Sequence, residues 1–90
     1  MQFEWDEIKA AQNLIKHGVS FEEAATVFGD PLSDTFNDPD HSAEERRFII
    51  IGMSERGRIL IVAHIDNEEV VRVITAREPT PGERRFYEET

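Results

Sequence analysis

The chain has 90 residues, of which 39% are apolar, and a formal net charge of −9 at neutral pH. This length fits one domain with a single core, spanning residues 1–90, and the negative charge argues against non-specific nucleic-acid binding by the protein as a whole. The chain has no cysteine, which excludes disulfides and thiolate metal sites. No apolar run approaches the roughly 20 residues of a membrane helix, and no signal peptide is apparent. We expect a cytoplasmic protein without membrane contact.

The charge is divided unevenly along the chain. Residues 1–45 hold eleven Asp or Glu and two Lys, whereas residues 46–90 hold eight Arg, eight Asp or Glu and no Lys. The planar Arg side chain can grip a phosphate or a carboxylate with two parallel hydrogen bonds. The Arg-only half therefore indicates either a phosphate-binding role or a set of local ion pairs.

The first third of the chain predicts a short strand and two helices. Alternation over residues 2–5 favours a strand, and Asp6 is a typical cap for a helix over 7–16 that ends at Gly18. Ser20 and Glu23 have capping-box spacing, which predicts a second helix over 21–28. Apolar residues recur at helical spacing in the first helix: Ile8, Ala11, Leu14 and Ile15. The second helix should turn its apolar residues inward: Phe21, Ala24, Ala25, Val27 and Phe28.

The rest of the chain predicts strands and a final helix. A short strand over 32–36 and a polar loop over 37–42 precede three strands over 46–53, 58–65 and 70–76, and a helix covers 82–89. Short turns between the three strands predict an antiparallel meander, so the fold class is α+β with the N-terminal helices packed on an antiparallel sheet and a short C-terminal helix. Both faces of the meander are apolar, which predicts that the C-terminal helix, a second copy or a partner covers the second face.

Motifs over nearly the whole chain resemble the BrnT family of toxins. The opening resemblance is carried by Phe3-Glu4-Trp5-Asp6, Lys9, Asn13 and the run Lys16-His17-Gly18-Val19-Ser20-Phe21-Glu22-Glu23-Ala24. The later pieces follow in the family's order: Phe28-x-Asp30-Pro31, Glu45-Arg46, Ile51-Gly52, Gly57-Arg58, Arg72-Val73-Ile74-Thr75-Ala76-Arg77 and Glu83-Arg84-Arg85-x-Tyr87. Each piece alone is weak, but together and in order they are specific.

The resemblance implies a function and partners. BrnT proteins are small bacterial toxins of type II toxin–antitoxin systems, similar in fold to RelE-type ribonucleases, that cut RNA and arrest growth. They are neutralised by BrnA, an antitoxin with a DNA-binding region, so operator DNA would be contacted only through the antitoxin, and the assembly would be a homodimer or a heterotetramer. The strong negative charge departs from the usual basic character of RelE-like nucleases.

RNA cleavage without a metal needs a base for the ribose 2′-OH, positive charge at the phosphate and an acid for the leaving oxygen. No spacing of ligand residues predicts a metal site or a cofactor. His17 is the leading acid/base candidate, and its alternative role is to cap the end of the first helix. Lys9 is either a phosphate contact or a solvated helix residue.

The Arg residues are the candidates for binding phosphate. Arg77, Arg46 and Arg58 are expected at the cleaved phosphate, with surface ion pairs as the alternative. Arg72 is five residues from Arg77, so the two point to opposite faces unless the strand bulges, and Arg72 has Glu69 as an alternative partner. Further RNA contacts are predicted for Trp5, Arg84 and Arg85. Trp5 can instead belong to the core, and the two Arg can pair with Glu88 and Glu89.

Two other functions fit the composition. The acidic first half also suits a module that docks onto a basic partner and has weak or no nuclease activity. A co-repressor subunit that acts only within a DNA-bound complex is a further alternative. Growth arrest on expression of the chain alone separates the toxin from both.

Overall fold

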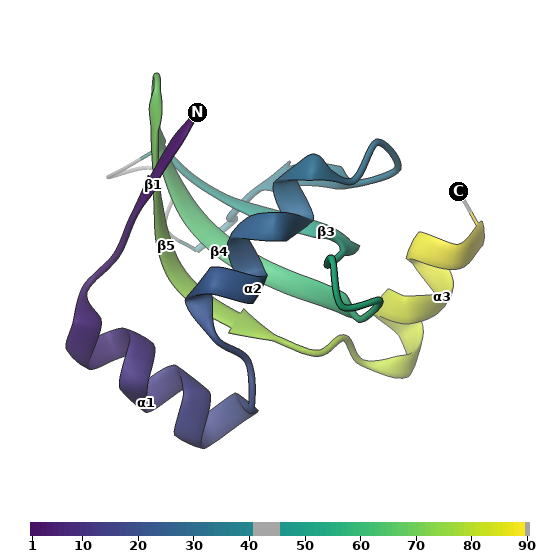
Figure 1. Cartoon of the computed structure of the whole chain (residues 1–90). Coiled ribbons are helices and arrows are strands. Elements are labelled where there is room, and N and C mark those ends of the chain that lie inside the picture. The colour runs from purple at the N-terminus through teal and green to yellow at the C-terminus, as the bar shows by residue number, and fades with distance from the viewer. Residues whose placement is uncertain (41–45, 90) are drawn as a thin grey trace.

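The computed structural model describes residues 1–40 and 46–89, so positions 41 and 42 of the predicted polar loop lie outside the described residues. Figure 1 shows α2 crossing in front of the sheet, with α1 and α3 toward opposite ends of the molecule. The helices are α1 (Glu7–His17), α2 (Phe21–Thr26), a short 3-10 turn η1 (Val27–Gly29) and α3 (Pro81–Glu89). The strands are β1 (Gln2–Glu4), β2 (Asp34–Asn37), β3 (Arg47–Met53), β4 (Ile59–Asn67) and β5 (Val70–Arg77). In the described part of the chain, no helix is long and apolar enough to cross a membrane.

The five strands form one mixed sheet in the order β1-β5-β4-β3-β2. The predicted meander of β3, β4 and β5 is confirmed, and β2 extends it antiparallel to β3. The prediction of a wholly antiparallel sheet is wrong for β1, which pairs parallel to β5 with Glu4 opposite Arg72. A parallel pair needs a long connection between its two strands, and here the chain from the end of β1 to the start of β5 forms that connection.

The predicted caps form at both N-terminal helices. Asp6 accepts hydrogen bonds from the backbone of Ile8 and Lys9, and Gly18 ends α1 in the left-handed conformation with φ of 69°. The Ser20 side chain accepts the backbone N–H of Glu23 at 3.0 Å. The Glu23 carboxylate, however, turns to other partners, so only half of the capping box is realised.

The main core lies between α2 and one face of the sheet. Phe21, Ala24 and Val27 are fully buried there, which confirms the predicted inner face of the second helix. They pack with Val19 and with residues of β3, β4 and β5. The sheet residues of this cluster are Ile50, Leu60, Val62, Val73 and Ala76.

Helix α1 is oriented against its own apolar pattern. Ile8, Leu14 and Ile15 are 70%, 51% and 87% exposed, whereas the polar Asn13 is the buried residue of the helix. The Asn13 amide donates to the carbonyls of Val19 at 2.9 Å and Ala76 at 2.8 Å, and its oxygen accepts the Ala76 N–H at 3.1 Å. The side of α1 that meets the rest of the protein therefore combines the small Ala10 with a polar anchor, Asn13.

Helix α3 covers part of the second sheet face, in agreement with one of the predicted covers. Tyr87 packs against a small cluster of Ile51, Ile59 and Ile61. The Tyr87 hydroxyl donates to the Asp30 carboxylate, and this hydrogen bond raises the pKa of Tyr87 to about 12. A second link joins Arg77 at the end of β5 to Glu83. Helix α3 is thus held by two polar links above an apolar surface.

A bulge in β5 sets the direction of its arginines. Thr75 pairs with Ala63 and Val73 pairs with His64, so Ile74 between them is the extra residue. Arg72 is opposite Ile65 and Arg77 is opposite Ile61, and residues paired across a sheet share a face. Arg72 and Arg77 therefore point to the same face of the sheet. Without the bulge, their five-residue spacing would place them on opposite faces.

Candidate active site

A basic hollow lies between α1 and the bulged part of β5, with a volume of about 270 Å³. We use the name basic hollow for its lining residues, which are Lys9, Gln12, Asn13, Lys16, His17, Ile74 and Thr75. The lining includes both lysines of the chain and one of its three histidines, but no Asp or Glu among the residues that the structure describes. The hollow therefore attracts anions within a strongly acidic protein.

The helical repeat brings the cationic side chains together. Lys9 and Lys16 are two turns apart and Lys16 precedes His17, so all three can face the same space beside β5. The three hydrogen bonds of Asn13 fix the rotation of α1 over β5. Two predicted site residues, His17 and Lys9, are thus brought together. Lys16 was missed because a Lys in the last turn of a helix is commonly solvated.

Arg58 lies next to this hollow without lining it. Its guanidinium donates to the carbonyl of Gly18 at 3.2 Å, directly after His17. It also binds both carboxylate oxygens of Glu23, whose side chain is 3% exposed. The Ser54 hydroxyl donates to the same carboxylate at 2.7 Å. Arg58 and then Ser54 lower the pKa of Glu23, which keeps this buried group ionised as an anchor for the α1–α2 junction.

The Arg side chains expected at one phosphate do not all meet in one pocket. Neighbouring antiparallel strands begin at opposite ends of the sheet, so Arg46 before β3 and Arg58 before β4 are far apart. Most other Arg candidates have carboxylates of their own. The pairs are Arg72 with Glu4 at 3.0 Å, Arg77 with Glu83 at 2.8 Å and Arg84 with Glu88 at 3.8 Å. Arg72 therefore pairs with Glu4 of the neighbouring strand β1 and not with Glu69. The pair of Arg84 with Glu88 has the four-residue spacing from which it was predicted.

The comparisons with known proteins agree with the architecture. The family described as "Ribonuclease toxin, BrnT, of type II toxin-antitoxin system" matches residues 5–83. The chain belongs to the BrnT family. The crystal structure of the Brucella abortus ribonuclease toxin BrnT is similar, with a TM-score of 0.69 and 24% identity over 89% of this chain and 97% of that one. At this identity the likeness shows the fold alone, and a search of curated proteins found no match.

Trp5 occupies a packing position in this BrnT chain. Its ring meets the buried Phe21 edge-on, with ring centroids 6.0 Å apart, and its N–H donates to Glu7 at 3.0 Å. Trp5 also packs at the margin of the main core. This is the core alternative for a lone Trp, and stacking on an RNA base stays a prediction. Arg85 is exposed on α3, so an RNA contact there also stays a prediction.

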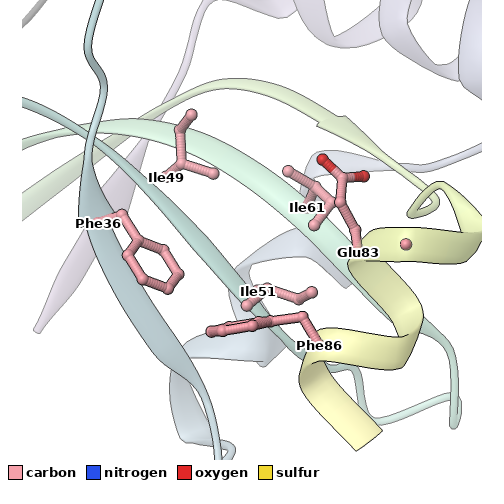
Figure 2. Close-up of a pocket in the computed structure, with 7 residues that line it drawn as sticks. Phe36, Ile49, Ile51, Ile61, Glu83 and Phe86 are labelled. Carbon is pink, nitrogen blue, oxygen red and sulfur yellow. The ribbon is translucent and has the colours of Figure 1, made fainter.

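A second hollow in the BrnT chain is apolar. This apolar groove, of about 320 Å³, lies between α3 and the second sheet face and is lined by Phe36, Ile49, Ile51, Ile61, Gly82, Glu83 and Phe86. Figure 2 shows Phe36 and Phe86 facing each other across it, with ring centroids 5.6 Å apart. Its one charged lining residue is the carboxylate of Glu83, which is paired with Arg77. The groove therefore suits an apolar group and not a phosphate.

Proposed function

We propose that this BrnT chain is an endoribonuclease toxin that cleaves RNA at the basic hollow. The observation that supports the proposal most is the concentration of Lys9, Lys16 and His17 around one space that no carboxylate of residues 1–40 or 46–89 lines, in a chain of net charge −9. Ammonium groups attract phosphate and repel a divalent cation, so this set of side chains suits metal-independent cleavage.

In the proposed reaction the ribose 2′-OH attacks the adjacent phosphorus. The His17 imidazole takes the hydroxyl proton as the new O–P bond forms, while Lys9 and Lys16 stabilise the charge that grows on the phosphate oxygens. The bond to the 5′-oxygen then breaks, and that oxygen takes a proton from the imidazolium or from solvent. The products are a 2′,3′-cyclic phosphate and a 5′-hydroxyl.

The arginines take outer roles in this proposal. Arg58 holds the Gly18 carbonyl, so it positions the end of α1 that carries His17. The other candidate residues would contact RNA beyond the cleaved phosphate. Those Arg that pair with a carboxylate would have to exchange that carboxylate for a phosphate. These candidates are Trp5, Arg46, Arg72, Arg77, Arg84 and Arg85.

The partners follow from the family. A toxin of a type II system has an antitoxin, and we propose a BrnA-like protein that also contacts the operator DNA. We further propose that the protein acts in the cytoplasm, where RNA is available, and that it forms either a homodimer or, with the antitoxin, a heterotetramer. The negative charge of the first half of the chain would attract a basic partner by long-range electrostatic steering, before direct contacts form.

Replacing His17 by Ala tests the proposed chemistry. We expect RNA cleavage by the purified chain to fall at least about 100-fold, the usual contribution of a general acid or base, and growth arrest to be relieved. The thermal midpoint should change little because His17 lies at a helix end and is only half-buried. Arg56→Ala, which also removes an exposed basic side chain, lies outside the hollow and is not among the RNA-contact candidates, serves as the control.

Two outcomes would contradict the proposal. Cleavage by His17→Ala at the wild-type rate would remove His17 from the chemistry. A wild-type chain that neither cleaves RNA nor arrests growth at confirmed expression, yet binds its antitoxin, would favour the second candidate function, an acidic partner-binding module. The net charge of −9 is the observation that keeps this candidate in view.

A further inference from the structure

The outward side of α1 is an apolar surface without cover in the described structure. Its outer face carries the side chains of Ile8, Ala11, Leu14 and Ile15, all exposed, with Ile15 87% exposed, and the exposed Glu7 lies on the same side in the first turn. Together with Met1, the three large residues make up half of the exposed large apolar side chains of the described residues; the others belong to β2, α3, the end of β3 and the turn before β2. An exposed apolar stripe of this kind marks an interaction site more often than chance.

The outward orientation is fixed and does not reflect a loosely held helix. Turning α1 to bury Ile8 and Ile15 would expose Asn13 and leave the carbonyls of Val19 and Ala76 without their hydrogen bonds. Buried backbone groups without partners are rare because their desolvation is costly. The polar contact therefore holds the apolar face toward solvent.

The charge beside the outer face defines what can cover it. Lys9 and Lys16 directly follow Ile8 and Ile15, so with Gln12 they form a row along one edge of the stripe. The same three side chains line the basic hollow. Anything that packs on the outer face and meets this row also covers the side of the hollow formed by α1.

We propose that the outer face of α1 binds an amphipathic helix of the antitoxin, with an apolar stripe on Ile8, Ala11 and Ile15 and a row of carboxylates against Lys9 and Lys16. Such a helix would exclude RNA from the basic hollow, so the inference rests on the proposed function for its inhibitory consequence. The carboxylates would take the place of RNA phosphates at the two lysines.

A second copy of the chain fits this surface less well. If two α1 helices packed antiparallel about a two-fold axis, the lysine rows of both copies would lie along the same side of the interface. Like charges opposed in this way weaken association. A helix with carboxylates on that edge has the opposite effect, so charge favours the antitoxin over self-association.

The test measures binding of the purified antitoxin, the product of the gene paired with this toxin, to the full chain. We expect Ile8→Glu combined with Ile15→Glu to weaken the antitoxin affinity at least 100-fold. Leu32→Glu is the matched control because Leu32 is 67% exposed and precedes β2 at the far edge of the sheet, and its affinity should stay within about threefold of wild type. The thermal midpoint of both variants should stay near wild type, since no buried side chain changes.

Further measurements separate this inference from the proposed function. Ile8→Gln with Ile15→Gln, which adds no charge beside the lysines, should cleave RNA like wild type but escape inhibition by the antitoxin. Lys9→Glu with Lys16→Glu should also weaken antitoxin binding and reduce its salt dependence, a readout that needs no activity. If wild type proves unable to cleave RNA, the proposed function fails while the two affinity measurements still decide the docking surface.

Three results would overturn the inference. One is wild-type affinity of Ile8→Glu with Ile15→Glu for the antitoxin. Another is a free chain that is dimeric by sedimentation and becomes monomeric on Ile15→Glu, since a second copy would then cover the face. The third is an unchanged antitoxin affinity of Lys9→Glu with Lys16→Glu, since this would show that the docking helix places no carboxylates against the two lysines.

Discussion

Asn13 contributes more to the placement of the candidate site than any apolar residue of α1. It is 7% exposed, and its three hydrogen bonds join the helix to the backbone of Val19 and of Ala76 in β5. The large apolar residues of the helix are exposed, and only the small Ala10 packs against the main core. The geometry of the basic hollow therefore depends on one buried amide.

Replacing Asn13 by Asp is expected to destabilise the protein strongly. The change keeps the shape but places a carboxylate against two carbonyl oxygens that the amide now donates to, and we expect a loss of at least about 2–3 kcal/mol in the free energy of unfolding. Urea unfolding of the purified chain measures it. Asn67→Asp at the exposed end of β4 is the control, and equal effects of both changes would contradict this role for Asn13.

At the level of single residues, the sequence predicted parts of the candidate site. His17 and Lys9 were expected as site residues from their chemistry, and helical geometry brings them together. The sequence alone argues against placing Arg46 and Arg58 at the same phosphate. Each precedes one of two neighbouring antiparallel strands, and such strands start at opposite ends of the sheet. Glu23 was hidden, since its capping-box position suggested a local role while its actual partner, Arg58, is 35 residues away.

Helix α3 is attached by polar links whose strength depends on pH. Arg77 lowers the pKa of the Glu83 carboxylate to about 2, and the backbone N–H of Thr80 adds to this effect. A carboxylate with a lowered pKa in the folded state stabilises that state at pH values above its ordinary pKa of 4.5. This stabilisation is lost as the pH falls from about 4.5 toward 2.

We expect the thermal midpoint of the wild-type chain to fall over this acid range partly because Glu83 becomes protonated. Glu83→Gln should start from a lower midpoint at pH 7 and should lose less stability between pH 4.5 and pH 2. The effect is modest because the Glu83 side chain is 36% exposed and solvent screens the pair. Midpoints measured for both chains across the range check it, and parallel curves would show that the link does not stabilise α3.

At the level of elements, local patterns predicted where helices and strands occur but not all of their contacts. Caps, turns and β-branched runs placed every helix and strand close to its observed bounds. Periodicity showed that α1 has an apolar side without showing that this side faces solvent. The parallel pairing of β1 was missed because its partner lies almost at the other end of the chain, and only the assembled sheet brings them together.

The whole molecule combines a strongly negative net charge with the small basic hollow that we propose as the RNA site. The net charge of −9 opposes the approach of a polyanion, whereas Lys9, Lys16 and His17 attract phosphate at short range. Each phosphate contact to a single strand contributes a slope of about −0.7 to the dependence of log affinity on log salt. Two or three contacts therefore give a slope of about −1.4 to −2, which is made shallower as salt screens the repulsion.

We expect RNA binding by the catalytically inactive His17→Ala chain to weaken only slightly with salt, with a slope between about 0 and −2. Lys9→Ala in the same background should make the slope less negative by about 0.7, and Arg56→Ala, at an exposed residue outside the hollow, should leave it unchanged. Titration of a labelled RNA at several salt concentrations gives the slopes. A slope steeper than about −3 would require a basic surface other than the hollow.

Function at the scale of the whole chain came from motifs and not from composition. The order of the short pieces from Phe3 to Tyr87 indicated the BrnT family, and the family match over residues 5–83 confirms it. Net charge alone pointed away from a nuclease, because a total does not report where charges lie. The hollow became visible only when α1 and β5 were placed together in space.

The inward residue Asn13 holds α1 in place while the outward residues are free of that role, and this difference has an evolutionary consequence. Of its eleven residues, all of which the structure describes, only Asn13 is buried, and the outward positions take no part in holding the helix in place. Mutations can accumulate at those positions without unfolding the protein. Paralogous toxins with the same scaffold could diverge there until each responds only to its own inhibitor, and crosstalk between operons in one genome would be avoided.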